Sequence, residues 1–113
     1  MNERTQQLRD ELIEALESGT YKQAQGRLRR GDAFCCLGVA CNIHDPSLWN
    51  AAETYSLNTY CLTIRVREDY GFYDSDGAPE FDDGPSLVLL NDDGKTFPQI
   101  AAELRTGKYW KPL

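Results

Sequence analysis

The sequence has no long apolar run, and this absence excludes the simplest membrane architecture. None of its apolar stretches approaches the roughly 20 residues that a transmembrane helix needs. The N-terminal segment Met1–Gln7 is polar and lacks the apolar core of a secretory signal peptide. From these two absences we expect a cytoplasmic protein that has no membrane partner.

Histidine is scarce, and the sequence lacks paired cysteine motifs. His44 is the only histidine, so any Cys–His catalytic pair would depend on this one residue. The paired C-x₂₋₄-C motifs of common zinc sites are missing. We therefore expect no metal and no other cofactor. If zinc were bound, the available ligands would be Cys35, Cys41, His44 and Cys61.

Motifs for nucleotides and calcium are also missing. The sequence has no Walker motif and no dinucleotide-binding glycine pattern. An acidic segment that starts at Asp74 fails as an EF-hand loop, because Ala78 and Pro79 stand where the fifth and sixth loop positions need an oxygen ligand and a glycine. The other acidic residues of this segment are Asp76, Glu80, Asp82 and Asp83.

What the sequence does contain indicates one globular domain spanning residues 1–113. The composition is 41% hydrophobic and 27% charged, which is ordinary for such a domain. Without a secretory signal, the four cysteines are expected to be reduced. Free cysteine is among the most buried residue types, so we expect these side chains mainly to fill the core.

Hydrophobic periodicity predicts helices near both ends of the chain. A stripe of leucine and isoleucine predicts a helix over residues 3–18, ended by Gly19. Thr96 to Gln99 forms a capping box that opens a helix reaching about Arg105. The tail 107–113 either packs through Tyr109 and Trp110 or is mobile.

The middle of the chain predicts a short β-hairpin followed by a buried helix. The arms of the hairpin are expected near 25–29 and 33–34. The apolar run from Cys35 to about Ile43 predicts a buried cysteine-rich helix, capped by Asp32 and ended before Pro46. The predicted fold class is therefore α+β and mostly helical.

Further along, the pattern is less uniform. Residues 46–61 are expected to be irregular, and 72–85 to form a loop. A short apolar helix is expected over Ser86–Leu90. For residues 62–70, alternation favours a strand and i, i+4 spacing favours a helix, and both alternatives stay open on the residues alone.

Charge is segregated along the chain, and this segregation suggests a binding site. A basic segment from Lys22 to Arg30 contains no acidic residue, whereas nine acidic residues and no Lys or Arg lie between Glu68 and Asp93. The basic segment leads into a helix N-terminus, where a phosphate could bind. The candidate ligand-binding residues are Tyr21, Lys22, Gln23, Arg27, Arg29, Arg30 and Asn91. The alternative is that both charged segments are only solvated faces.

Other hypotheses use other residues. The acidic segment could occupy a basic groove on a partner protein. Direct DNA binding is not expected, because the net charge of −6 repels phosphate. A small enzyme would use Cys36, activated at a helix N-terminus, with Asn91 or Asp92 orienting the substrate. An assembly component would need a homo-oligomeric or partner interface, for which Tyr109 and Trp110 are candidate exposed aromatics.

Three sequence blocks resemble a family of small, largely uncharacterised proteins of tailed phages and bacterial genomes. They are Tyr21-Lys22-Gln23 with Gly26 and Leu28, Phe34 to Val39 with Cys41, and Leu90-Asn91-Asp92 with Gly94, Phe97, Ile100 and Ala101. The resemblance implies that the second and third blocks meet in space, and it favours a helix at 62–70. The sequence departs from the family pattern at Ala24-Gln25 and in the acidic segment.

The resemblance also implies a phage accessory protein in the host cytoplasm. Our leading hypothesis is a non-enzymatic protein that modulates a host defence factor. It would bind either a nucleotide-type small molecule through the basic segment or a host protein through the acidic one. A cysteine-dependent enzyme and a virion or assembly component are the alternatives.

Overall fold

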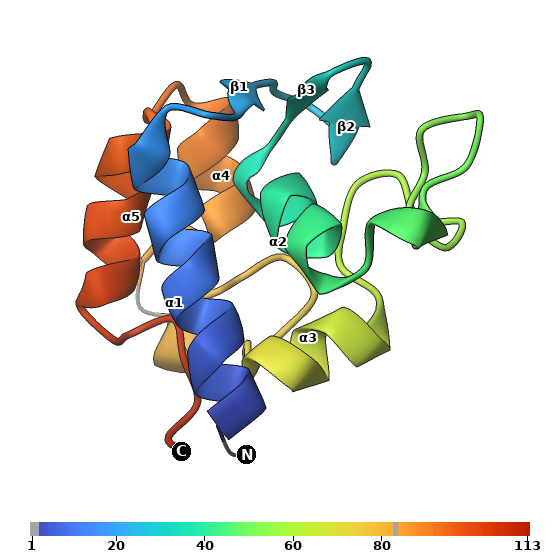
Figure 1. The fold of residues 1–113 in the computed structure, drawn as a ribbon. Helices are drawn as coiled ribbons and strands as arrows, with labels where there is room; N and C mark the ends of the chain where they lie inside the picture. Colours follow the sequence, from blue (N-terminus) through green and yellow to red (C-terminus); the bar gives the residue numbers. More distant parts are fainter. Residues whose placement is uncertain (1–2, 83) are drawn as a thin grey trace.

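A computed structural model describes residues 3–82 and 84–113 of the chain, so Asp83 of the predicted acidic segment lies outside the described residues. The predicted fold class is confirmed: one α+β domain in which helices predominate (Figure 1). The helices are α1 (Glu3–Ser18), α2 (Cys36–His44), α3 (Ile64–Tyr70), α4 (Leu87–Asp92) and α5 (Phe97–Arg105), with 3₁₀ turns η1 (Pro46–Leu48) and η2 (Glu80–Asp82). The strands are β1 (Lys22–Gln23), β2 (Arg29–Arg30) and β3 (Ala33–Phe34).

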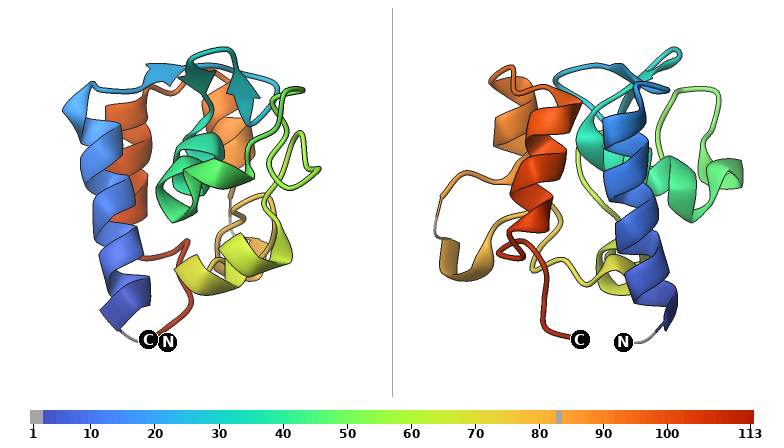
Figure 2. Two further views of the ribbon diagram at one scale, coloured as in Figure 1. Left: turned by 45° about the vertical axis from the view of Figure 1, so that its right-hand side comes forward. Right: turned by 60° about the vertical axis from the view of Figure 1, so that its left-hand side comes forward.

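The predicted terminal helices pack side by side. In α1 the whole apolar stripe is buried, against α5 on one side and α2 on the other (Figure 2). The capping box of α5 is present as predicted: Thr96 Oγ1 accepts from Gln99 N, and the Gln99 side chain accepts from Thr96 N. Within the part of the chain that the structure describes, none of the helices has both the length and the apolar character needed to cross a membrane.

The predicted hairpin is present, but its first arm is displaced. The arm at Ala33–Phe34 is correct, whereas the other arm is Arg29–Arg30 and not residues 25–29. A two-residue turn at Gly31-Asp32 sets this register. Gly26 cannot join the ladder because its N–H donates to Asp92 Oδ1 at 2.9 Å. On the other side of β3, β1 pairs in parallel, which completes a three-stranded sheet of order β1-β3-β2.

The buried helix is correct, but its predicted cap is wrong. Cys35 is the N-cap of α2, and its Sγ accepts a hydrogen bond from Gly38 N at 3.4 Å. Asp32 instead pairs with Lys22 Nζ at 3.0 Å on the surface. Pairing of Ala33–Phe34 as β3 moves the start of the helix beyond the reach of Asp32.

Residues 64–70 form a helix, as the family resemblance favoured. Thr63 Oγ1 caps it by accepting from Val66 N at 3.2 Å, and Gly71 ends it at a φ of 79°. Leu62 and Val66 are buried whereas Ile64 is 66% exposed, so the side chains do not follow the alternation of a strand packed on the core.

The C-terminal residues pack onto the domain. Tyr109 is completely buried and Trp110 is half-buried against the core, so they are not the exposed aromatics expected for an assembly interface. Lys111 N donates to Gly71 O at 2.8 Å, and Arg9 Nη2 donates to Lys111 O at 2.9 Å. The backbone of Lys111 thus joins α1 to the end of α3.

Candidate binding surface

The second and third sequence blocks meet at Asn91, as the resemblance implied. The buried Asn91 Oδ1 accepts from Cys36 N at 3.2 Å and from Gln23 Nε2 at 2.9 Å. Its Nδ2 donates to Ala24 O at 2.7 Å. Asn91 therefore ties β1, α2 and α4 together, and these polar atoms are engaged within the protein rather than directed at a ligand.

The thiols near this junction are not activated. Burial raises the pKa of Cys35 to about 11, although the amides of the first helical turn partly oppose it. Burial raises the pKa of Cys36 well above its ordinary value, and the Cys36 thiol donates to Leu87 O at 3.6 Å. A nucleophilic cysteine reacts as the thiolate. Cys36 is neutral at neutral pH, so this geometry does not support the cysteine-enzyme alternative.

The candidate zinc ligands Cys35, Cys41, His44 and Cys61 all lie in the described part of the chain. Cys35 and Cys41 are buried, and burial also raises the pKa of Cys41. His44 is engaged by Tyr55 and Asp69. Across the described ranges 3–82 and 84–113, no group of three or more His, Cys, Asp or Glu side chains is placed to hold a metal ion.

The predicted basic residues divide into two sets. Lys22 is neutralised by Asp32, and the Tyr21 hydroxyl accepts from Asn42 Nδ2 at 3.0 Å. The three arginines instead bond to neutral backbone oxygens: Arg27 Nη2 to Ala52 O, Arg29 Nε to Gly31 O and Arg30 Nε to Gln25 O. Among the ion pairs of the described residues, none includes these three guanidinium groups.

Arg29 is further oriented by aromatic rings. Its guanidinium carbon lies 5.3 Å from the ring centroids of both Phe34 and Trp49. This stacking holds the charge at the surface of the sheet in a defined position. The three arginines therefore retain a local positive charge on a protein of negative total charge.

The loop between η1 and α3, within a region that the sequence predicted to be irregular, lies beside these arginines. Leu28 N donates to Thr59 O at 2.8 Å, and Arg27 Nη2 reaches Ala52 O at 3.0 Å, so the loop is tied to the sheet. At its tip, Tyr55 and Asn58 pair across a two-residue turn, and Ser56 and Leu57 have φ angles of 48° and 73°. Positive φ at both positions is the pattern of a type I′ turn, which normally uses Asn and Gly.

The loop displays large hydrophobic side chains. Leu57 is 87% exposed and Tyr60 is 67% exposed. A non-glycine residue in the left-handed region carries a conformational cost, so the fold holds Leu57 outward against local preference. We refer to Arg27, Arg29, Arg30, Leu57 and Tyr60 together as the basic lobe. The sequence signal that could have found its apolar part is the presence of leucine and tyrosine in a segment without periodicity.

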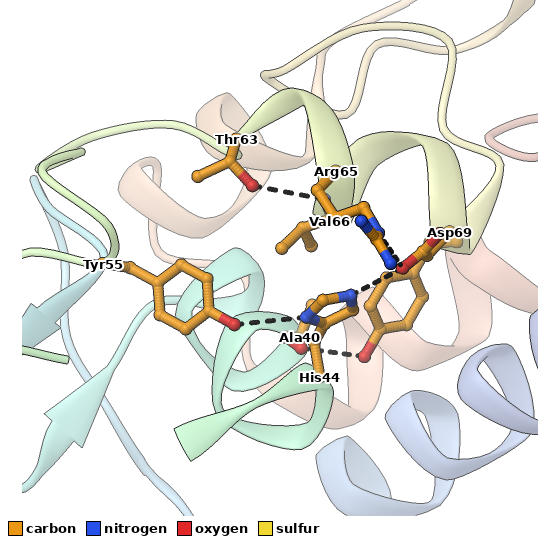
Figure 3. A network of polar contacts seen from close by, with 8 residues as sticks. Ala40, His44, Tyr55, Thr63, Arg65, Val66 and Asp69 are labelled. Atoms are coloured by element: carbon orange, nitrogen blue, oxygen red, sulfur yellow. Dashed lines mark hydrogen bonds and ion pairs between the residues drawn. The ribbon is translucent and has the colours of Figure 1, made fainter. Parts of the chain in front are cut away.

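A series of hydrogen bonds fixes this loop to α2 and α3 (Figure 3). His44 Nε2 lies 2.8 Å from Asp69 Oδ2, and His44 Nδ1 lies 3.2 Å from the Tyr55 hydroxyl. Arg65 Nε donates to the same Asp69 oxygen at 3.3 Å. With the Nε2 proton directed at the carboxylate, Nδ1 accepts from the phenol. The loop, α2 and α3 are thereby joined through one imidazole.

The electrostatics of these hydrogen-bonded residues favour an ionised Asp69 carboxylate and a neutral Tyr55 phenol. Burial alone would raise the pKa of Asp69, but hydrogen bonds from His44 and Arg65 outweigh it and hold the pKa below its ordinary value. Burial raises the pKa of Tyr55, whose side chain is fully covered. The covered Tyr55 hydroxyl is used within the fold, and these hydrogen bonds position the loop.

A separate groove of about 280 Å³ lies between α1, α5 and the C-terminal segment. Its most buried charge is Arg9, which donates to Tyr70 O at 2.8 Å and to Lys111 O, with its guanidinium 4.8 Å from the Trp110 ring centroid. Arg105, on the rim, forms two hydrogen bonds with Glu17. These contacts account for both arginines as structural ties between helices.

Comparison of the sequence with known protein families identifies one match. The model of the family described as Domain of unknown function (DUF8296) matches residues 1–108. The chain belongs to this family. No curated protein and no solved structure matches the chain. The DUF8296 match covers every helix and strand of the fold, including the basic lobe.

Proposed function

We propose that this DUF8296 protein is a non-enzymatic binding module whose basic lobe recognises an acidic surface on another protein. The observation that carries the proposal is the combination of Arg27, Arg29 and Arg30, which form no ion pair among the described residues, with the exposed side chains of Leu57 and Tyr60. Arginine and tyrosine are the residue types that most often dominate binding energy at protein interfaces. An acidic partner would supply the missing countercharges.

The geometry supports a protein partner better than a nucleotide. Of the candidate ligand-binding residues, Gln23 and Asn91 bond to each other and to backbone groups. The apolar side chains at the loop tip project outward, which suits a partner surface. A nucleotide-type ligand held by the arginines and Tyr60 remains the second candidate.

The biological setting follows from the resemblance to proteins of tailed phages. In that setting the acidic partner would be a host protein, and binding would modulate or inhibit a defence factor in the host cytoplasm. Support for a non-enzymatic role comes from the neutral, buried thiol of Cys36 and from the covered phenol of Tyr55. The virion or assembly role has less support, because Tyr109 is used inside the domain.

An NMR titration of the ¹⁵N-labelled protein tests the proposal with two probes. One probe is a synthetic peptide of alternating glutamate and leucine, and the other is ATP. We expect the peptide to shift the amide signals of residues 27–30 and 56–60. The double variant Arg30→Glu, Tyr60→Ser should weaken peptide binding by about tenfold or more, because it removes a countercharge and an aromatic anchor.

Lys111→Glu provides the matched control, since it makes the same charge change at an exposed position away from the lobe. It should leave peptide affinity within about twofold. Shifts at the lobe with ATP and none with the peptide would favour the nucleotide candidate instead. If neither probe perturbs the lobe, the proposal is wrong.

A further inference from the structure

A second surface of the same chain has the opposite charge and a similar construction. Phe81 is 91% exposed, and its backbone lies in the left-handed region at φ 60° and ψ 21°. Asp76 and Glu80 are exposed beside it in sequence, within a stretch that contains no Lys or Arg between Glu68 and Asp93. We refer to Asp76, Glu80 and Phe81 together as the acidic tip.

The acidic tip is held in place by the fold. Glu80 N donates to Lys108 O at 2.8 Å, and Leu87 N donates to Gly77 O at 2.9 Å. Asp74 Oδ1 accepts from the amides of Asp76 and Ala78. The residue before Phe81 is therefore bound through its backbone to the C-terminal segment, and the segment that carries the tip is closed by the bond between Leu87 and Gly77.

Phe81 and Leu57 share two unfavourable features, an exposed hydrophobic side chain and a left-handed backbone conformation. A single exposed hydrophobic residue on a protein surface needs no explanation. These two, however, both adopt a backbone conformation that asparagine or glycine would adopt with less strain. Packing inside the domain does not offset this strain, because both side chains are almost fully exposed. Acidic residues stand near Phe81 in the sequence, whereas Leu57 lies on the loop to which Arg27 and Leu28 bond.

The two patches cannot meet within one molecule. The segment around η2 and the loop between η1 and α3 lie at opposite ends of the domain (Figures 1 and 2). Their charges and their exposed apolar side chains nevertheless complement each other. The chain thus carries both halves of a contact that only two molecules can complete.

We propose that the acidic tip of one copy docks on the basic lobe of a second copy. Phe81 would pack against Leu57 and Tyr60, while Asp76 and Glu80 would face the arginines of the lobe. The contact is head-to-tail, so repeated docking closes a ring or extends a filament. This inference rests on the proposed function of the basic lobe and adds a second copy of this chain, beside the host protein, as an acidic partner of that lobe.

Sedimentation velocity of the full chain and of two single variants tests the inference. Leu57→Asn disables the lobe, and Phe81→Asn disables the tip. Asparagine tolerates the left-handed conformation, so both variants should melt at or above the wild-type temperature. A loss of association in them therefore cannot be attributed to unfolding. Leu113→Asn, which alters a 61% exposed side chain outside both patches, is the control.

We expect the wild type and Leu113→Asn to associate with increasing concentration, and less so at high salt. Each patch variant alone should stay monomeric. An equimolar mixture of the two should form a dimer and nothing larger, because only one intact tip and one intact lobe remain to pair. This rescue by mixing is specific to a head-to-tail contact.

Two outcomes would overturn the inference. One is a wild type that stays monomeric at its highest soluble concentration. The other is a wild type that associates while one patch variant also associates alone, since that pattern would indicate a two-fold contact through the patch left intact. A monomeric wild type that still binds the glutamate–leucine peptide would refute self-docking alone and leave the proposed function in place.

Discussion

At the scale of single residues, Cys36 and Asn91 illustrate how burial decides chemistry in this fold. The first turn of α2 offers amides and a helix dipole that favour a thiolate. These contributions are smaller than the cost of placing a charge in the core, so the pKa of Cys36 rises rather than falls. Asn91 was a candidate residue in both the binding hypothesis and the enzyme hypothesis. Its side chain instead forms hydrogen bonds with Gln23, Ala24 and Cys36.

Thiol accessibility gives a direct prediction at this scale. Cys35, Cys36 and Cys41 are buried, whereas Cys61 is partly exposed on the loop before α3. Brief treatment of the folded protein with iodoacetamide should therefore modify one thiol, Cys61, and treatment in denaturant should modify all four. Mass spectrometry of the intact protein and its peptides provides the count. Rapid modification of Cys36 in the folded state would contradict its neutral, buried assignment and revive the enzyme alternative.

At the scale of elements, α2 depends on a single glycine. A Cβ atom added to Gly38 would lie 1.9 Å from Leu28 O, which is backbone and cannot rotate away. Gly38→Ala should destabilise the protein by about 3 kcal/mol or more, although alanine normally favours a helix by about 1 kcal/mol. Urea unfolding followed by circular dichroism measures the change.

Gly19→Ala is the matched control for this variant. Gly19 has nothing within 4 Å of its added Cβ but has a φ of 77°. Its replacement should cost only about 1 kcal/mol, from backbone strain alone. Equal losses for the two variants would show that the close approach of α2 to Leu28 is not what requires glycine at position 38.

The link between the loop and α3 should be sensitive to acid. The folded-state pKa of Asp69 is lowered, so its contribution is present above the unfolded-state pKa and is lost as pH falls through the folded-state value. Asp69→Asn should lower the unfolding free energy at neutral pH by on the order of 1 kcal/mol. Its difference from the wild type should shrink below the ordinary pKa of an aspartate, about pH 4. Urea titrations at several pH values test this, with Asp76→Asn as a control for loss of charge.

The same elements show which features could be predicted from sequence. The helices α1 and α5 were predictable because their signals, an apolar stripe and a capping box, are local. The cap of α2 was not, because pairing of β3 with its neighbours decides where the helix starts. Of the residues of the basic lobe, only the arginines were predicted from the sequence as binding residues. Its apolar half lies in a loop whose shape depends on Leu28, His44 and other distant partners.

At the scale of the whole molecule, the C-terminal segment closes the domain. Tyr109 is fully buried, and the neighbouring backbone supports both the acidic tip through Lys108 O and the end of α3 through Lys111 N. Arg9 of α1 donates to the same segment at Lys111 O. The tail therefore connects three parts of the chain that are far apart in sequence.

Removal of this segment should consequently unfold the protein rather than trim it. Tyr109→Ala should cost about 3 kcal/mol or more, because it leaves a cavity in the core. Truncation after Thr106 removes Tyr109, the Trp110 ring and the backbone bonds of Lys111, and should abolish cooperative thermal unfolding in calorimetry. Truncation after Lys111 removes only the exposed Pro112 and Leu113 and should leave the transition unchanged. A cooperative transition in the shorter chain would mean that α1, α3 and the acidic tip hold together without the tail.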